Sequence, residues 1–116
     1  MESSCIFCKI ITNQIPSKKI KETGSVLVIQ DISPKAPTHL LILPKKHIIN
    51  LAHIQAEDLL IITETIQMAT DLSKEIKTGF NLISNNGTDV GQSVLHLHWH
   101  FLAGRNFYKE GGLKLD

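Results

Sequence analysis

The chain has 116 residues, 42% of them hydrophobic, and its 12 Lys and Arg against 11 Asp and Glu give a formal net charge of +1. We therefore expect one domain, spanning 1–116, with a modest core and no broad basic surface of the kind that binds nucleic acid. No apolar run is long enough for a signal peptide or a membrane span, which predicts a cytoplasmic protein without a membrane partner.

The first predicted element is a short helix over 5–11, which stops before Pro16. Ile6 and Ile10 are spaced to share one face of this helix, and Phe7 lies beside them. Core packing is sufficient to explain these three side chains.

Cys5 and Cys8 belong to the same helix and form a Cys-x-x-Cys pair. Two cysteines so close together cannot staple a fold. In a reducing compartment the spacing indicates a metal site, redox thiols or two inert cysteines. A thioredoxin-like redox motif requires a βαβ context, which the sequence after Cys8 does not provide. Metal binding is therefore the favoured interpretation.

Five segments are predicted as strands, and most connections between them are short enough for antiparallel neighbours. The run 25–32 is continuously apolar, which is typical of a strand covered on both faces. The predicted fold class is α+β, an antiparallel five-stranded sheet with one short and one long helix packed on one side. The strands are expected at 18–22, 25–32, 39–43, 80–84 and 94–102.

Two polar residues flank the connection between the second and third of these strands. Asp31 stands just before a Ser-Pro pair, where a turn-forming Asp is ordinary. His39 precedes four aliphatic residues, where a hydrogen-bonded core histidine is the simplest interpretation.

A long amphipathic helix is predicted over 56–76, ended by Gly79. Leu60 and Ile61 widen its apolar surface and fit either the core or a dimer contact. No catalytic side chain is expected on this helix. Its apolar stripe consists of Leu59, Ile62, Ile66, Ala69, Leu72 and Ile76.

The most informative segment is 94–102, Val-Leu-His-Leu-His-Trp-His-Phe-Leu, which holds three of the chain's six histidines. Strict alternation predicts a strand with His96, His98 and His100 on one face and apolar residues on the other. Neighbouring histidines would lie roughly 7 Å apart at the backbone, and the outer two roughly 13 Å apart. One metal ion could hardly reach all three rings, so we expect the central histidine to differ in role from the outer ones.

Glycine and small polar residues at 85–93 lead directly into this segment. Such a loop can direct backbone N–H groups at an anion, although most loops of this composition are plain turns. Beside several imidazoles, a loop lined with donors suits phosphoryl chemistry.

These segments together resemble the histidine triad (HIT) family of nucleotide hydrolases and transferases, and most closely its branch of small histidine triad nucleotide-binding phosphoramidases. The resemblance runs from Cys5 to Arg105. The motifs that carry it are Gly91-Gln92-Ser93-Val94-x-His96-x-His98-x-His100, Cys5-Ile6-Phe7-Cys8-Lys9-Ile10-Ile11, Asp31-Ile32-Ser33-Pro34, Pro37-Thr38-His39 and Pro44-Lys45-Lys46-His47.

The resemblance implies a single HIT domain that hydrolyses purine nucleoside 5'-phosphoramidates through a covalent nucleotidyl-histidine intermediate. In the implied catalytic set, His98 is the nucleophile, and the carbonyl of Gly91 fixes its tautomer. His100 contacts the phosphate oxygens and is oriented by His39, while Ser93 holds the phosphate or the leaving group. Related transferases carry glutamine at the position of His100, so hydrolysis is favoured.

The resemblance also implies a binding site for the AMP or GMP part of the substrate. Asp31 would accept hydrogen bonds from the ribose hydroxyls, since a carboxylate offers several acceptor positions. The residues expected to bind nucleotide are Asp31, Ile32, Ile6, Phe7, Ile10, Ile29, Asn85, Gly91, Gln92, Ser93, Val94, His98 and His100.

Some bacterial members of the family bind zinc, and the matching positions here are Cys5, Cys8, His47 and His96. Four protein ligands with no open position would make a structural zinc site. The zinc would tie the N-terminal helix to the histidine segment, and catalysis itself would need no metal. The resemblance further implies a homodimer in which the five-stranded sheets join edge to edge into one sheet of ten strands.

The chain departs from many relatives at two places. Ile29 replaces an aromatic residue against the base, and 107–116 lacks the Trp-Pro-Pro-Gly ending that shapes substrate preference in some relatives.

Other interpretations of the function also stay open. They are a dinucleoside polyphosphate hydrolase or nucleotidyltransferase of the same superfamily, a zinc hydrolase with His96 and His98 as ligands, and a non-catalytic nucleotide- or partner-binding module.

Overall fold

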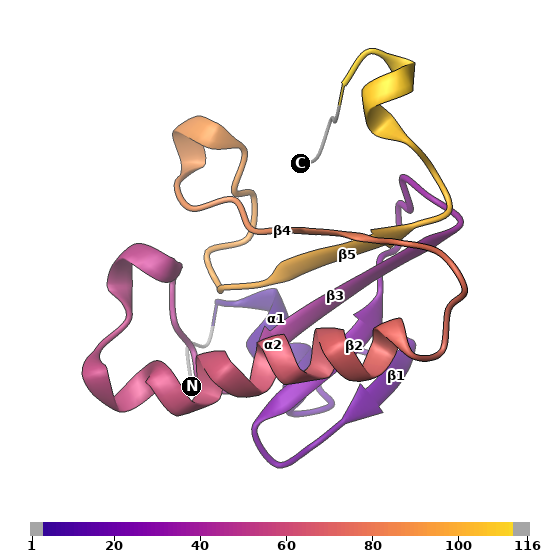
Figure 1. Cartoon of the computed structure of the whole chain (residues 1–116). Helices are drawn as coiled ribbons and strands as arrows, with labels where there is room; N and C mark the ends of the chain where they lie inside the picture. Colours follow the sequence, from indigo (N-terminus) through magenta and orange to yellow (C-terminus); the bar gives the residue numbers. More distant parts are fainter. Residues whose placement is uncertain (1–3, 113–116) are drawn as a thin grey trace.

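The computed structural model describes residues 4–112, which form two α-helices and five strands (Figure 1). In chain order these elements are α1 (Ile6–Ile11), β1 (Lys19–Glu22), β2 (Val26–Gln30), β3 (Thr38–Pro44), α2 (Leu59–Ser73), β4 (Asn81–Ile83) and β5 (Trp99–Ala103). Short 3₁₀ helices occupy the connections at η1 (Leu51–His53), η2 (Ala56–Asp58) and η3 (Thr88–Val90), and η4 (Phe107–Glu110) follows β5.

All five strands form one antiparallel sheet in the order β1-β2-β3-β5-β4. The predicted α+β class and the five-stranded antiparallel sheet are therefore confirmed. Strands β1 and β4 are the two edges, and β3 lies at the centre. Among residues 4–112, no helix is long and apolar enough to cross a membrane.

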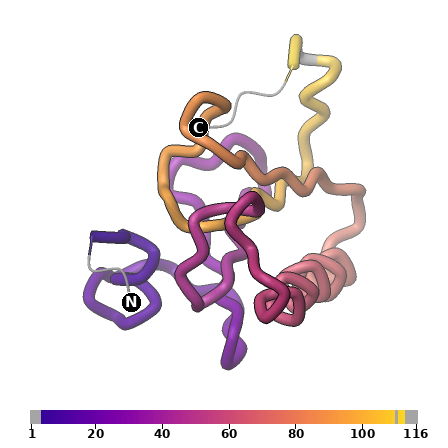
Figure 2. Tube along the Cα trace, turned by 90° about the vertical axis from the view of Figure 1, so that its left-hand side faces the viewer, coloured from indigo at the N-terminus to yellow at the C-terminus, as the bar shows by residue number. Residues whose placement is uncertain are grey.

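Successive residues of β2 and β3 are buried on alternate faces of the sheet. Leu27 and Leu43 pack with the side chains of α1, whereas Val28 and Ile42 pack with those of α2. The helices consequently lie on opposite sides of the sheet, as the two views show (Figure 1, Figure 2). The expectation that both helices pack on one side is wrong. A strand that is apolar on both faces needs a cover on each, and α1 supplies the second one.

The last strand is shorter than the predicted strand 94–102, which is a second correction. Pairing of β3 with β5 extends only as far as Ile42 opposite Trp99, and residues 94–98 lie outside the ladder, with bends at 94–96. Pro44 cannot donate a backbone hydrogen bond, and its carbonyl accepts one from the His96 side chain instead. Leu95, expected in the core, is consequently 50% exposed.

Helix α2 occupies the middle of its predicted range, 56–76, because its first turn is a separate 3₁₀ helix. The carboxylate of Asp58 is buried, and it accepts hydrogen bonds from the Lys46 ammonium and from the backbone N–H of Gln55. The contact with Gln55 is part of a capping box at the start of η2, and the contact with Lys46 ties this 3₁₀ helix to the chain beyond β3.

The buried stripe of α2 is displaced from the predicted one. Leu59 and Ile66, expected in the core, are 55% and 42% exposed. Thr65, which the apolar periodicity missed, is fully buried. Its hydroxyl donates to the carbonyl of Ile62 at 2.6 Å and accepts from Trp99 Nε1 at 3.0 Å, so this polar side chain is satisfied in the core.

Leu72 anchors α2 to the sheet, and we predict that Leu72→Ala lowers the free energy of unfolding by about 2–5 kcal/mol through lost burial and a residual cavity. Thr70→Ala changes an exposed position of the same helix and should stay within about 0.5 kcal/mol of the wild type. Urea unfolding followed by circular dichroism measures both variants. Equal losses would show that α2 is not held by its buried stripe.

Candidate active site and metal centre

A cavity of about 340 Å³ opens on the α1 side of the sheet, between α1, the ends of β2 and β3, and the segment before β5. It brings together most of the residues that the sequence predicted for nucleotide binding and catalysis. These lining residues are Ile6, Phe7, Ile10, Ile29, Asp31, Ile32, His39, Ser93, Val94, His98 and His100.

His39 and His100 meet because of the register of the two central strands. His100 lies opposite Leu41 and His39 opposite Leu102, which makes the two histidines diagonal neighbours on one face of the sheet. Both side chains are buried, and His39 Nε2 lies 2.9 Å from His100 Nδ1. The shared face is the one covered by α1.

The hydrogen bonds around His39 determine which ring nitrogens carry hydrogen. The backbone N–H of Lys35 donates to His39 Nδ1 at 2.9 Å, so this nitrogen must be the acceptor. A neutral His39 then carries its hydrogen on Nε2 and donates it to Nδ1 of His100. Burial lowers the pKa of His39, which favours this neutral form. A neutral His100 must accordingly carry its own hydrogen on Nε2.

The same reasoning assigns the opposite tautomer to His98, which is buried. Its Nδ1 lies 2.7 Å from the carbonyl of His96, and since a carbonyl only accepts, Nδ1 carries the hydrogen. The lone pair therefore resides on Nε2. Burial lowers the pKa of His98, so the ring is a neutral base near pH 7. The expectation that Gly91 supplies this carbonyl is wrong, because His96 does.

Asp31 has two sets of contacts, which fit both interpretations of its sequence position. Its Oδ1 accepts from the backbone N–H of Ser33 at 2.8 Å, as in an ordinary turn. Its Oδ2 lies 3.4 Å from His39 Nε2, and the residue lines the cavity. The carboxylate thus lies beside the His39–His100 pair with acceptor positions directed at a ligand site.

The loop before the histidines has a structural role that its composition did not predict. Asn85, Gly91 and Gln92 do not line the cavity. Gln92 is buried, and its side-chain amide donates to the carbonyls of Ile49 and Val94 and accepts from the backbone N–H of Gly87. The amide thus holds the loop in place, and only Ser93 and Val94 of this segment reach the cavity.

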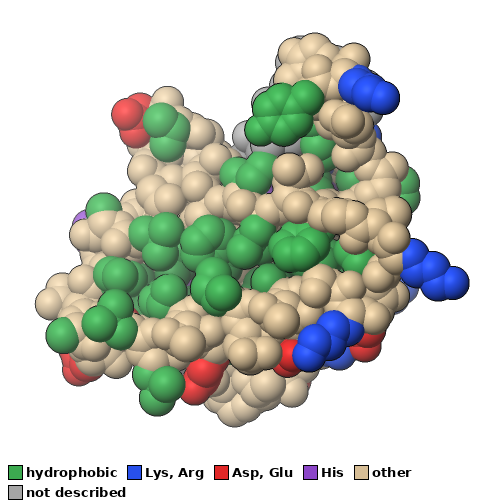
Figure 3. Space-filling view, in the orientation of Figure 1, with side chains coloured by type: hydrophobic (Ala, Val, Ile, Leu, Met, Phe, Trp, Pro, Cys, Tyr) green, Lys and Arg blue, Asp and Glu red, His purple; other side chains and the backbone are tan. Residues whose placement is uncertain are grey.

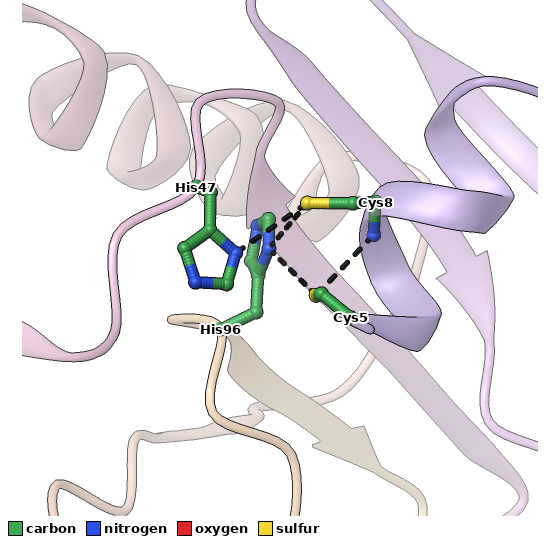
Figure 4. Close-up of side chains that lie close together, drawn as sticks. All are labelled: Cys5, Cys8, His47 and His96. Atoms are coloured by element: carbon green, nitrogen blue, oxygen red, sulfur yellow. Dashed lines mark hydrogen bonds between the residues drawn. The ribbon is translucent and has the colours of Figure 1, made fainter. Parts of the chain in front are cut away.

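Cys5, Cys8, His47 and His96 converge at one point although they come from three distant segments (Figure 4). The distances from Cys5 Sγ and Cys8 Sγ to His96 Nδ1 are 3.4 and 3.7 Å, and Cys8 Sγ lies 3.4 Å from His47 Nδ1. A tetrahedral zinc ion with Zn–S of about 2.3 Å and Zn–N of about 2.0 Å separates sulfur and nitrogen ligands by about 3.5 Å. The four side chains therefore fit a tetrahedral metal ion.

The tautomer of His96 also suits a metal ligand. Its Nε2 donates to the carbonyl of Pro44 at 2.8 Å, which leaves the lone pair of Nδ1 directed at the two sulfurs. Burial lowers the pKa of this imidazole to about 4, so it is neutral and able to ligate. Burial raises the pKa of the Cys5 thiol, which is the reverse of what a redox-active Cys-x-x-Cys pair requires.

The hydrogen bonds separate His96 from His98, because His96 Nδ1 is directed at the cysteines and His98 Nδ1 at a backbone carbonyl. A zinc hydrolase with these two histidines as ligands is not what the arrangement favours. Asp31, His39 and His100 also lie close enough to surround a cation. Both nitrogens of His39 are already engaged, however, and this group fits a chain of hydrogen bonds better than a metal site.

Several residues that line the cavity were not predicted from the sequence. Leu41 could have been found, since it follows His39 by two residues in a strand and must share its face. Lys35 acts on His39 through its backbone N–H, which has no sequence signature. The additional lining residues are Ile15, Pro16, Ser17, Gln30, Ser33, Lys35 and Leu41.

The sequence matches the HIT domain family over residues 12–107. A HIT-like protein from Synechocystis is 38% identical over 109 residues, which covers 92% of this chain and 96% of that protein. The structure is similar to a HIT family hydrolase from Clostridium thermocellum, with a TM-score of 0.88, 36% identity and 99% of each chain covered. A histidine triad protein from Clostridium difficile gives a TM-score of 0.86 at 40% identity, over 91% of this chain and 95% of that chain.

Acid should destabilise the metal-free protein because burial holds the pKa of His39, His96 and His98 below the unfolded value. The unfolded chain binds more protons below about pH 6.5, so the free energy of unfolding falls as the pH decreases from about 6.5 towards 4. Urea unfolding between pH 7.5 and 4.5 measures the slope. His96→Asn should reduce it, whereas His53→Asn, which changes an exposed histidine, should leave it unchanged.

Proposed function

Because the chain belongs to the HIT domain family, we propose that it is a nucleotide-binding hydrolase that cleaves purine nucleoside 5'-phosphoramidates through a nucleotidyl-histidine intermediate on His98. The observation that carries this proposal is the tautomer of His98, whose Nε2 lone pair belongs to a ring that lines the cavity. A neutral imidazole with a fixed tautomer is a nucleophile suited to phosphorus.

The cavity offers complementary surroundings for each part of a nucleoside monophosphate. Ile6, Ile10 and Ile29 form an apolar wall for the purine base, and Phe7, which also lines the cavity, packs against the His98 ring. Asp31 accepts hydrogen bonds from the ribose hydroxyls and Ile32 covers the sugar. Since Ile29 cannot stack as an aromatic ring does, base binding depends on burial between aliphatic side chains.

The phosphate lies between His98, His100 and Ser93. His98 Nε2 attacks the α-phosphorus, a nitrogen–phosphorus bond to the imidazole forms, and the bond from phosphorus to the amine breaks as the amine takes up a proton from water. His100 donates its Nε2 hydrogen to a phosphate oxygen, while His39 keeps that tautomer in place. Water then attacks the phosphorus and releases the nucleoside monophosphate and free His98.

We also propose that Cys5, Cys8, His47 and His96 bind zinc. Two thiolates and two imidazoles at tetrahedral spacing leave no open position, so the metal has a structural role and supplies no nucleophile. The ion would cross-link α1 to the segment that precedes β5, two parts of the chain that no strand pairing joins.

A homodimer is the assembly that the surface supports best. The face that carries α2 and β4 shows a band of apolar side chains (Figure 3). Leu60 on α2 and Phe80, which directly precedes β4, are exposed apolar residues, at 71% and 39% exposure. Strand β4 is an edge of the sheet and has no charged side chain, whereas the other edge, β1, carries charged residues that discourage pairing. Pairing of two β4 strands would join the two sheets into one.

The alternatives fall into two classes, other enzymes of the same superfamily and non-catalytic modules. A dinucleoside polyphosphate hydrolase or a nucleotidyltransferase would use the same His98 chemistry with a different leaving group or acceptor. A non-catalytic module would bind the nucleotide without turnover. The cavity would bind a nucleotide in each case. The two classes differ in whether a covalent nucleotidyl group ever forms on His98.

In single turnover with phosphorus-labelled adenosine phosphoramidate, we predict that label accumulates on the wild-type protein and on neither His98→Ala nor His98→Gly. Hydrolysis should fall by more than about 10³-fold in both variants, because the nucleophile is lost. His53→Asn is the matched control, since it removes an exposed histidine that does not line the cavity.

The outcomes separate the candidate functions. Equal hydrolysis by His98→Ala and the wild type would remove the covalent mechanism. Turnover without label on the protein would favour a metal-bound water. Tight binding of AMP with the phosphoramidate left intact would identify a binding module.

For the dimer, we predict that Ile66→Glu on α2 shifts the protein to monomers in sedimentation velocity, because a carboxylate would be buried in the contact. Ile20→Glu is the matched control on β1, the opposite edge of the sheet. The two isoleucines are similarly exposed, at 42% and 37%. A wild-type monomer, or a dimer disrupted equally by both variants, would contradict the proposed interface.

A further inference from the structure

The segment that carries His96 and His98 is not held by the sheet. Residues 94–98 precede β5 and belong to no strand, so the strand ladder does not fix their position. His98 is nevertheless buried beside the cavity. Contacts other than strand pairing must therefore fix residues 94–98 beside the cavity.

His96 provides that attachment. Its side chain is fully buried, with Nε2 hydrogen-bonded to the Pro44 carbonyl and Nδ1 within 3.4 Å of Cys5 Sγ. The next residue, Leu97, donates its backbone N–H to the carbonyl of Ile48 at 2.6 Å. The main chain at His96 is thus fixed from both sides, and the cysteine–histidine cluster supplies one of the attachments.

The carbonyl of His96 is also the acceptor that determines the tautomer of His98. The distance from His98 Nδ1 to this oxygen is 2.7 Å. If the main chain at His96 moved, the acceptor would be lost, and the hydrogen could occupy either nitrogen of the His98 ring. A ring with its hydrogen on Nε2 has no lone pair to offer there.

Phe7 makes a second connection between the cluster and His98. It lies between Cys5 and Cys8 on α1, and its ring contacts His96 and His98 edge to face, with centroid distances of 5.7 and 5.0 Å. The cysteines thus position the helix whose aromatic side chain packs directly against the His98 ring.

We propose that the cluster of Cys5, Cys8, His47 and His96 is a positioning device for His98, which acts through the His96 carbonyl and the Phe7 ring to keep the His98 Nε2 lone pair available to the cavity. The four cluster residues are positioning residues and touch no substrate. Only the kinetic part of the test rests on the proposed function, because the tautomer of His98 can be observed without substrate.

The test compares the metal-loaded wild type with Cys8→Ser and His47→Ala at a fixed pH of about 7.5, where unperturbed imidazoles are mostly neutral. Imidazole ¹H–¹⁵N spectra report which nitrogen of each histidine carries hydrogen. In the wild type, we expect His98 to show hydrogen on Nδ1 alone. In both variants we expect its two nitrogens to average towards a mixture, while His100, held by His39 and by β5, keeps its tautomer.

Kinetics provide the second readout. The single-turnover rate of the variants should fall by about 10–100-fold, the usual cost of losing a group that orients a reactive one. AMP affinity should fall less than the rate, because Ile29 and Asp31, which also line the cavity, do not lie on α1. Leu72→Ala serves as the control for stability, since it weakens the fold from the α2 side and should alter neither the His98 spectrum nor the rate at temperatures where it is folded.

An unchanged His98 spectrum in folded Cys8→Ser and His47→Ala would overturn the proposal and limit the cluster to a stabilising role. If neither variant folds, stepwise removal of the metal from the wild type with a chelator, followed in the same spectra, gives the answer. A wild type that binds AMP without turnover would defeat the proposed function, but the His98 spectrum would still decide whether the cluster sets the tautomer.

Discussion

The hydrogen bond from His96 Nε2 to the carbonyl of Pro44 is the contact on which the geometry of the site depends. It occupies the last carbonyl of the central strand β3 with a side chain, at the point where ladder pairing with β5 stops. It places the hydrogen of His96 on Nε2, so that Nδ1 is directed at the cysteines. The end of strand β3, the tautomer of His96 and the path of the histidine segment are thus set together by one interaction.

The two faces of the sheet differ in what they carry, because one lines the cavity and the other packs into the core. On the α1 side, alternate residues of β3 and β5 deliver His39 and His100 to the cavity. On the α2 side, the residues between them, such as Leu40 and Phe101, form the core with Met68. Neighbouring positions along β5 therefore differ in their surroundings: His100 lines the cavity, whereas Phe101 is fully buried in the core and contributes to stability.

Much of this fold and site could be predicted from the sequence. Apolar runs and alternation found all five strands and the class of the sheet, because these patterns reflect local periodicity. The resemblance between motifs brought Cys5 and His96, 91 residues apart, to one predicted site, and the structure places them together. The start of β5 could not be predicted, since alternation shows that a chain is extended but not whether a partner strand is present.

Other features could not be predicted from the sequence because they depend on contacts that have no sequence signature. Thr65 is buried because Trp99, from a distant strand, donates to its hydroxyl. Lys35 acts through a backbone N–H, which every residue except proline has. The side on which each helix packs depends on how the chain crosses the sheet, and periodicity within an element carries no information about that crossing.

Trp99 is the chain's single tryptophan, and it packs on the α2 side of β5 with its indole hydrogen-bonded to Thr65. The Trp99 indole therefore lies on the α2 side of the sheet. The imidazoles of His98 and His100, its neighbours in sequence, lie on the α1 side and line the cavity. Tryptophan fluorescence of this protein consequently reports on the packing of α2 against the sheet. A dye or label would be needed to follow ligand binding in the cavity on the other side.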